Sequence, residues 1–156
     1  MAKLAFPVKW AMLEAMPRRI ASDRVAEPVE EYSTEWHSHR NLRVWQRGVA
    51  LAEAVYEATA RFPASESFGL SSQMRRAAVS VPANIAEGHA RGTTGEFARS
   101  LRTSRGSLAE LDTHIEIARR RRYLPAAAAD ALDRRVQELR TMVNLLSRSV
   151  RGKVAG

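Results

Sequence analysis

Apolar side chains recur every three or four residues from Asn41 onward, and this spacing predicts four amphipathic helices in succession. The first helix is expected to start after Asn41, a suitable N-cap, and to end before Pro63, which disfavours helix in the residue preceding it. Its inward positions are predicted to be Leu42, Trp45, Val49, Ala52, Tyr56 and Thr59. Four more apolar side chains lie off this stripe: Val44, Leu51, Val55 and Phe62.

The second predicted helix, over about residues 70–89, contains a proline in its interior. Its inward positions are Leu70, Met74, Ala77, Val81 and Ile85. An interior proline costs a helix roughly 3 kcal/mol, because it removes a backbone donor. Packing or function must therefore offset Pro82, and we expect a bend there. Gly88 and Gly92 supply the residues that end the helix.

The third helix is predicted to begin at a capping box, in which Thr93 is followed three residues later by Glu96. Its inward positions are Phe97, Leu101, Ser104, Leu108, Leu111, Ile115 and Ala118. It ends in the cations 119–122, which complement the negative end of the helix dipole. Pro125 suits the first turn of a fourth helix. The apolar stripe of that helix is Leu132, Val136, Leu139, Val143, Leu146 and Val150.

Four helices with short connections predict an all-α fold, an antiparallel up-down-up-down four-helix bundle over residues 41–152. Residues 1–40 have no sustained period and contain three prolines, so they are predicted to be a largely irregular N-terminal extension with local helix around residues 10–16. Met12 and Met16 are alternative translation starts within this extension.

Apolar side chains outside the predicted stripes indicate self-association, because a single copy would leave them in water. They are the four off-stripe residues of the first helix together with Met142 and Leu145 of the fourth. The alternative is that a wider stripe on each helix buries them inside one bundle.

The amino-acid composition excludes several kinds of functional site. The chain of 156 residues is about one domain long, and it has no cysteine, which excludes disulfides, thiolate zinc sites and a cysteine nucleophile. No apolar run approaches the roughly 18 residues of a membrane-spanning helix, so a soluble cytoplasmic protein without a membrane partner is expected.

The formal net charge of +8 falls entirely on residues 41–156, since six basic and six acidic side chains cancel within residues 1–40. A strong positive charge, nearly all of it arginine, favours an anionic partner, and nucleic acid fits better than a membrane surface. Two alternatives remain open: a high-GC genome enriches arginine without functional demand, and scattered surface charge keeps a protein in solution.

The stretch from Phe68 to Gly88, FGLSSQMRRAAVSVPANIAEG, contains the most specific motif of the chain. It resembles the family of small four-helix bundle proteins first met as products of intervening sequences in 23S ribosomal RNA genes. The resemblance covers residues 41 to about 150 and extends to Val44-Trp45, Phe62-Pro63, Gly106-Ser107 and Tyr123-Leu124. We assign structural roles to six residues of the motif: Ser80, Pro82, Asn84, Ile85, Glu87 and Gly88.

This resemblance implies a bundle that assembles into a ring, typically a homopentamer. The accessory variability protein of diversity-generating retroelements is similar, which implies a reverse transcriptase and its RNA as partners. The chain departs from the family at Arg122, where a glycine is usual, and this departure puts the usual tight turn in question.

Six arginines of the second and third helices are the candidate nucleic-acid contacts: Arg75, Arg76, Arg91, Arg99, Arg102 and Arg105. A guanidinium suits phosphate because its planar donors bind two oxygens at once. The alternatives are a solvated face paired with Glu87, Glu96 or Glu110, and ion pairs of Arg75 or Arg76 across a ring interface.

No motif indicates catalysis, a metal site or a cofactor. Asn84 and Glu87 are interpreted as structural or interfacial, and the histidines lack the further ligands that a metal would need. The leading hypothesis is a non-enzymatic homo-oligomer that binds structured RNA through its arginines. The alternative is a structural adaptor that acts through protein contacts alone.

Overall fold

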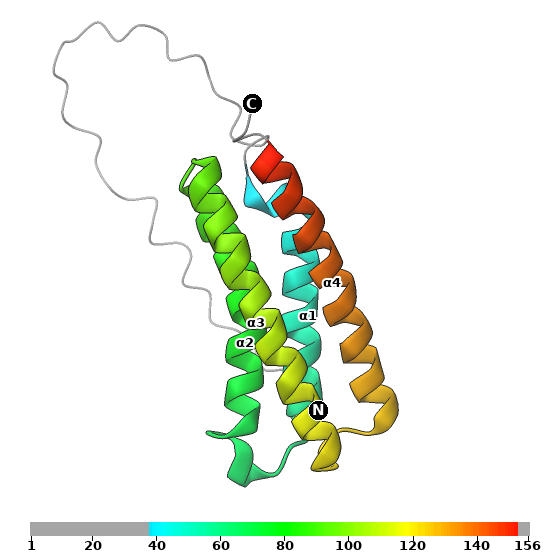
Figure 1. The fold of residues 1–156 in the computed structure, drawn as a ribbon. Helices are drawn as coiled ribbons and strands as arrows, with labels where there is room; N and C mark the ends of the chain where they lie inside the picture. The colour runs from blue at the N-terminus through cyan, green and yellow to red at the C-terminus, as the bar shows by residue number, and fades with distance from the viewer. Residues whose placement is uncertain (1–37, 153–156) are drawn as a thin grey trace, which may run out of the picture. The chain divides into compact units, whose positions relative to one another are not determined.

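The computed structural model describes residues 38–152, and they form four α-helices preceded and interrupted by short 3-10 helices (Figure 1). The α-helices are α1 (Arg43–Thr59), α2 (Leu70–Ala90), α3 (Thr94–Arg120) and α4 (Ala126–Gly152). The 3-10 helices are η2 (His39–Asn41) and η3 (Ala64–Glu66). Asn41 belongs to η2 and Leu42 occupies the N-cap of α1, so the predicted cap was one residue early. The extension predicted over residues 1–40 falls almost wholly outside the described residues.

Consecutive helices run antiparallel, as the alternating direction of the coloured chain shows (Figure 1). Only residues 91–93 join α2 to α3, and only residues 121–125 join α3 to α4. Links this short cannot return the chain along helices about 30 to 40 Å long. Each helix packs against its sequence neighbours, and α1 also packs against α4. The predicted all-α four-helix bundle is confirmed.

The core lies between the four helices, and its largest fully buried side chains are aliphatic. They are Leu51 and Val55 of α1, Met74, Val81 and Ile85 of α2, Leu101, Leu108, Leu111 and Ile115 of α3, and Val136, Leu139 and Val143 of α4. Every one of the α2, α3 and α4 residues in this set was predicted to point inward from its spacing.

The inward stripe of α1 was predicted correctly only for Ala52 and Thr59. Its buried residues are Val44, Gly48, Leu51, Ala52, Val55 and Thr59. Trp45 and Val49 are only half-buried, and Tyr56 is 49% exposed. Both stripes of α1 are apolar, so spacing alone does not choose between them. The buried stripe is the one that contains Gly48, at which an added Cβ would lie 3.2 Å from Pro82 Cβ of α2.

This correction removes part of the argument for self-association. The four α1 residues that seemed surplus are enclosed within one copy, as the alternative of a wider stripe held. On α4, Met142 is half-buried against the core, while Leu145 is 59% exposed. Exposed apolar side chains also occur on the outer sides of α1 and α2, where Tyr56 and Val79 reach solvent, and at Ile117 of α3.

The close approach of α2 to α3 depends on Gly88. A Cβ at this position would lie 2.4 Å from Ser100 Cβ of α3 and 3.2 Å from Phe97 Cδ2. Further along the same contact, the Ser80 and Ser107 hydroxyls lie 2.9 Å apart. Small residues on both helices therefore hold the two backbones together.

The turn after α3 keeps a left-handed residue although it has no glycine. Arg122 has φ 59°. The Tyr123 N–H donates to the Ala118 carbonyl (2.9 Å), and the Arg122 N–H donates to the Arg119 carbonyl (3.0 Å). This pair of bonds is the Schellman arrangement that ends many helices. The tight turn that the substitution put in question is thus present, with an arginine in a conformation that favours glycine.

A carboxylate ties the two loops at this end of the bundle together. Glu66 Oε2 accepts from the Leu70 N–H (3.0 Å), and Glu66 Oε1 accepts from the Tyr123 hydroxyl (3.0 Å). These two bonds lower the pKa of Glu66 below its usual value. A Cβ at Gly69 would lie 2.6 Å from Glu66 Oε2, and the Phe62 ring packs 5.5 Å from that of Tyr123. Phe62-Pro63 and Tyr123-Leu124, two of the residue pairs that carry the family resemblance, therefore come into contact at this end of the bundle.

Candidate nucleic-acid interface

The two α2 arginines differ in how tightly they are held. Arg75 is half-buried: its Nε donates to Thr59 Oγ1 (2.8 Å), and its guanidinium carbon lies 4.9 Å from the centre of the Tyr56 ring. Arg76 is exposed and holds no ion pair within residues 38–152. Both line a hollow of about 520 Å³ that also contains Glu110. Arg75 thus secures α2 to α1, while Arg76 is available to a ligand.

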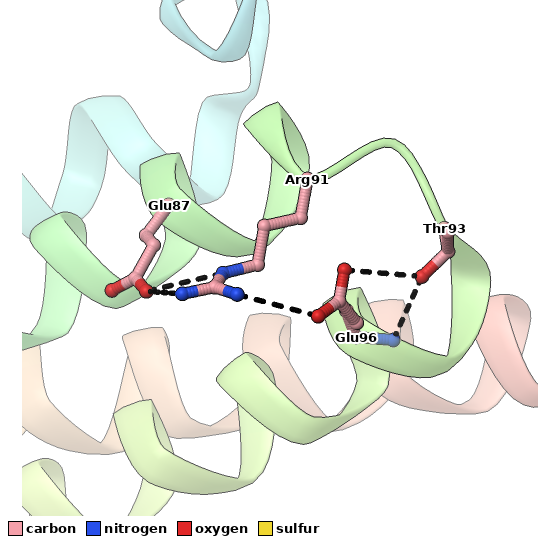
Figure 2. A network of polar contacts seen from close by, with 4 residues as sticks. All are labelled: Glu87, Arg91, Thr93 and Glu96. Carbon is pink, nitrogen blue, oxygen red and sulfur yellow. Dashed lines mark hydrogen bonds and ion pairs between the residues drawn. The ribbon is translucent and has the colours of Figure 1, made fainter.

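Arg91, in the link between α2 and α3, is neutralised by two carboxylates (Figure 2). Its guanidinium lies 2.5 Å from Glu87 Oε1 and 3.3 Å from Glu96 Oε1. The hydrogen bond with Glu87 is the main reason that the pKa of Arg91 is raised. Glu96 also donates its N–H to Thr93 Oγ1 (3.3 Å), which confirms the predicted cap of α3. For Arg91, the alternative of carboxylate partners is the one observed.

Three arginines in the first half of α3 are exposed and unpaired within the part of the chain that the structure describes: Arg99, Arg102 and Arg105. The side of α3 that faces α2 contains Ser104 and Ser107, whereas Asp112 faces α4 and pairs with Arg140 (3.2 Å). Arg105 precedes Asp112 by seven residues, or about two turns, and therefore shares its α4-facing side. Arg99, thirteen residues before Asp112, lies instead on the α2 side of α3, where it lines a hollow with Glu87 and Arg91. The α3 arginines therefore do not form one flank with Arg75 and Arg76, because Arg105 turns toward α4.

The sequence pattern alone did not single out Arg148 and Arg151, which are exposed on α4. Neither holds an ion pair among residues 38–152. Arg151 follows Arg140 by eleven residues, or about three turns, so it lies on the α3-facing side of α4. The signal in the sequence is an absence: residues 97–109 and 139–152 contain no aspartate or glutamate.

At the opposite end of the α3–α4 contact, Arg119 and Arg120 are paired. Arg119 Nη1 donates to Asp130 (2.8 Å), Arg119 Nη2 donates to Asp133, and Glu116 lies 3.4 Å from Arg119 Nε. The bond with Asp130 is the main reason that the pKa of Arg119 is raised, and burial opposes it. Arg120 pairs with Glu116 as well (2.7 Å). Ion pairs therefore neutralise these two arginines, whereas Arg148 and Arg151 at the other end hold none among the residues that the structure describes.

The chain was compared with protein families and with solved structures. Residues 40–145 match the model of the 23S rRNA-intervening sequence protein. The chain belongs to this family. A crystal structure from the S23 ribosomal protein family of Bacteroides thetaiotaomicron, a protein with unknown function, is similar, with a TM-score of 0.60 and 18% identity over 67% of this chain and 97% of that one. At this identity the likeness shows the fold alone. No curated protein matches the chain.

The motif shared with 23S rRNA-intervening sequence proteins has a packing role in this structure. Pro82, Ile85 and Gly88 are buried between the helices. Asn84 Nδ2 donates to the Ser80 carbonyl (2.7 Å) and to Ser80 Oγ (2.9 Å). Asn84 thus bonds within its own helix, to the residue two positions before Pro82. The sixth residue of the motif, Glu87, holds Arg91.

Two kinds of site are absent from residues 38–152 of this family member. No group of three histidines, aspartates or glutamates lies close enough together to hold a metal ion. Within the same residues, no helix combines the length and apolar character needed to cross a membrane. The chemistry that the described surface offers is that of unpaired guanidinium groups.

Proposed function

We propose that this protein is a non-enzymatic, homo-oligomeric helical bundle that binds structured RNA through exposed arginines. The observation that carries the proposal is the state of four of the six candidate arginines. Arg76, Arg99, Arg102 and Arg105 are exposed and hold no ion pair within the described residues. An unpaired guanidinium is a ready phosphate ligand, because binding breaks no existing pair.

Recognition of the RNA backbone fits better than stacking of unpaired bases. Base stacking requires exposed aromatic rings beside the positive charge. Phe97, near the α3 arginines, is half-buried and packs against His89 (5.8 Å between ring centres). Tyr56 is exposed, contrary to the core position that its spacing predicted, but the Arg75 guanidinium covers its ring.

Self-association is the second part of the proposal, and it rests on the outer sides of α1 and α2. Val49, Tyr56, Val79 and Pro82 line a hollow of about 650 Å³ there. Phe68, in the loop before α2, is 97% exposed. A second copy that covers this apolar surface would remove it from water. For the assembly we propose a ring of several copies, as the family resemblance implies.

RNA binding is tested with the full-length protein and a structured RNA hairpin at two salt concentrations. Four phosphate contacts predict that affinity falls about 100-fold between about 50 and 200 mM salt. Affinity that does not change with salt, or no binding at the lower concentration, would overturn the RNA-binding proposal.

A protein-only adaptor is the competing function, and the exposure of Phe68 favours it. A reverse transcriptase is the protein partner that we propose from the resemblance. Co-purification of the two proteins after nuclease treatment distinguishes an RNA-bridged role from a protein-only adaptor. Loss of the reverse transcriptase on RNA digestion supports an RNA-bridged role, whereas retention of it supports an adaptor.

A further inference from the structure

We infer that the RNA-binding surface is the α3–α4 basic face and that its ligand is the phosphate backbone of double-stranded RNA. The α3–α4 basic face consists of Arg102, Arg105, Arg148 and Arg151. This inference rests on the proposed function, and it names the surface and the ligand.

The register of the two helices brings these arginines together. The ion pair of Asp112 with Arg140 (3.2 Å) fixes residue 112 of α3 beside residue 140 of α4. Because the helices are antiparallel, seven residues toward the start of α3 and seven toward the end of α4 reach the same level. Arg105 is then level with Ser147, the residue directly before Arg148. Continuing in the same direction reaches Arg102 and Arg151.

The charge of the α3–α4 basic face is uncompensated. Its four guanidiniums are exposed and hold no ion pair among the described residues. Residues 97–109 and 139–152 contain no acidic side chain, so no carboxylate on these two stretches can neutralise them. A concentration of one sign of charge raises the local concentration of a polyanion and speeds its association.

The other candidate arginines are less suited to a ligand. Arg75 is held by Thr59 and Tyr56, and Arg91 by Glu87 and Glu96. Arg102 and Arg105 are one turn apart, about 4.5 Å along the axis of α3. Arg148 and Arg151 are also one turn apart on α4, whose axis lies about 8 to 10 Å from that of α3.

A cluster of guanidiniums without exposed aromatic rings beside it favours a duplex. Double-stranded RNA is recognised through its shape and its phosphates, whereas single strands are held mostly by stacking on aromatic side chains. Cations from two neighbouring helices can contact phosphates of both strands of a double helix. Binding is therefore expected to depend on the helical form of the RNA and not on its sequence.

The experiment measures the affinity of the full-length protein for an RNA duplex of roughly 20 base pairs and for an unpaired RNA of the same length. Arg102→Glu with Arg148→Glu reverses two charges on the α3–α4 basic face. Arg61→Glu with Arg134→Glu makes the same change in net charge at exposed, unpaired positions at the other end of the bundle. Arg76→Glu tests the α2 side.

We expect the wild type to prefer the duplex and the face variant to bind it about 100-fold more weakly, since each lost charge-assisted contact is worth about tenfold. The Arg61/Arg134 variant should stay near wild type. Circular dichroism and light scattering check folding and assembly. If the glutamate variant fails to fold, Arg102→Gln with Arg148→Gln makes the test, with about tenfold loss expected, because each glutamine amide still donates a neutral hydrogen bond to phosphate.

Each contrary result has a distinct meaning. If Arg76→Glu abolishes binding and the face variant does not, the location is wrong and the RNA-binding proposal stands. If the wild type prefers the unpaired RNA, the ligand class is wrong. If the wild type binds neither RNA, the proposed function itself fails.

Discussion

Arg122 is a residue whose backbone conformation and identity disagree. Its φ of 59° lies in the left-handed region, which costs a residue with a Cβ roughly 1–2 kcal/mol. Glycine has no such cost but loses more backbone entropy on folding. Arg122→Gly is therefore expected to raise the free energy of unfolding by about 1 kcal/mol, measured by urea denaturation.

A neighbouring position supplies the control. Arg120 is exposed in the last turn of α3 and pairs with Glu116. Arg120→Gly should lower the free energy of unfolding by about 1 kcal/mol, because glycine is unfavourable inside a helix. Equal effects of the two glycines would show that the turn after α3 is not strained.

Gly88 and Gly106 provide a contrast between two helical glycines. A Cβ at Gly88 would lie 2.4 Å from Ser100 Cβ, whereas nothing lies within 4 Å of a Cβ at Gly106. Gly88→Ala should destabilise the fold by about 1–3 kcal/mol, because α2 and α3 must separate. Gly106→Ala should stabilise it by about 0.5–1 kcal/mol through helix propensity.

The two alanine variants are compared with wild type by thermal and urea unfolding. Ser100→Gly in the Gly88→Ala background restores the room and should recover part of the loss. A double variant no more stable than Gly88→Ala would mean that the close approach to Ser100 is not the cause.

At the scale of the elements, Glu66 connects the loop before α2 with the loop after α3. The pKa of Glu66 is lowered by the Leu70 N–H and the Tyr123 hydroxyl, so the ionised form is favoured in the folded state. The stabilisation is present above the unfolded pKa, near 4.5, and is lost as pH falls through the folded pKa. Glu66→Gln should therefore be less stable than wild type at pH 7 and close to it at low pH.

The measurement is urea denaturation of wild type and Glu66→Gln from neutral pH to about pH 3. Carboxylates that both proteins share cancel in the difference. Tyr123→Phe removes one of the two donors and should reduce the pH dependence of the difference without abolishing it. A stability difference that is constant across this range would contradict the role assigned to Glu66.

Most of the helices were predictable because local chemistry marks their ends. Thr93 caps α3, Pro125 directly precedes α4, and α2 begins at Leu70 as its spacing predicted. The inward face of α1 was not predictable, because two apolar stripes compete and only the contact of Gly48 with Pro82 distinguishes them. Local spacing cannot report contacts between distant segments.

The candidate site was predictable in part for the same reason. Composition pointed to arginine, and spacing placed the α3 arginines on the surface. That Arg91 is neutralised follows from the positions of Glu87 and Glu96 around one link. The proximity of Arg148 to the α3 arginines depends on the register of α3 against α4, which a single ion pair with Arg140 reveals.

At the scale of the whole bundle, the α1–α2 side and the α3–α4 side differ in chemistry. The α1–α2 side has an apolar hollow with Tyr56 and Val79, and the α3–α4 side has four unpaired arginines. If a second copy covers the α1–α2 side, the α3–α4 side stays in contact with solvent in every copy. Several basic faces on one assembly would then bind one RNA with an avidity above that of a single face.

Assembly through the α1–α2 side is tested with Val79→Glu. Val79 is 43% exposed, so a single copy tolerates the change, and glutamate is a better helix former than valine. A buried, unpaired carboxylate at the contact between copies is costly, so the assembly should dissociate toward the 17.4 kDa monomer by light scattering, with helicity retained.

Leu145→Glu, at a 59% exposed apolar position of α4, is the control and should keep the wild-type mass. A wild type that is already monomeric at micromolar concentration would rule out the assembly, and dissociation by Leu145→Glu alone would move the contact to α4.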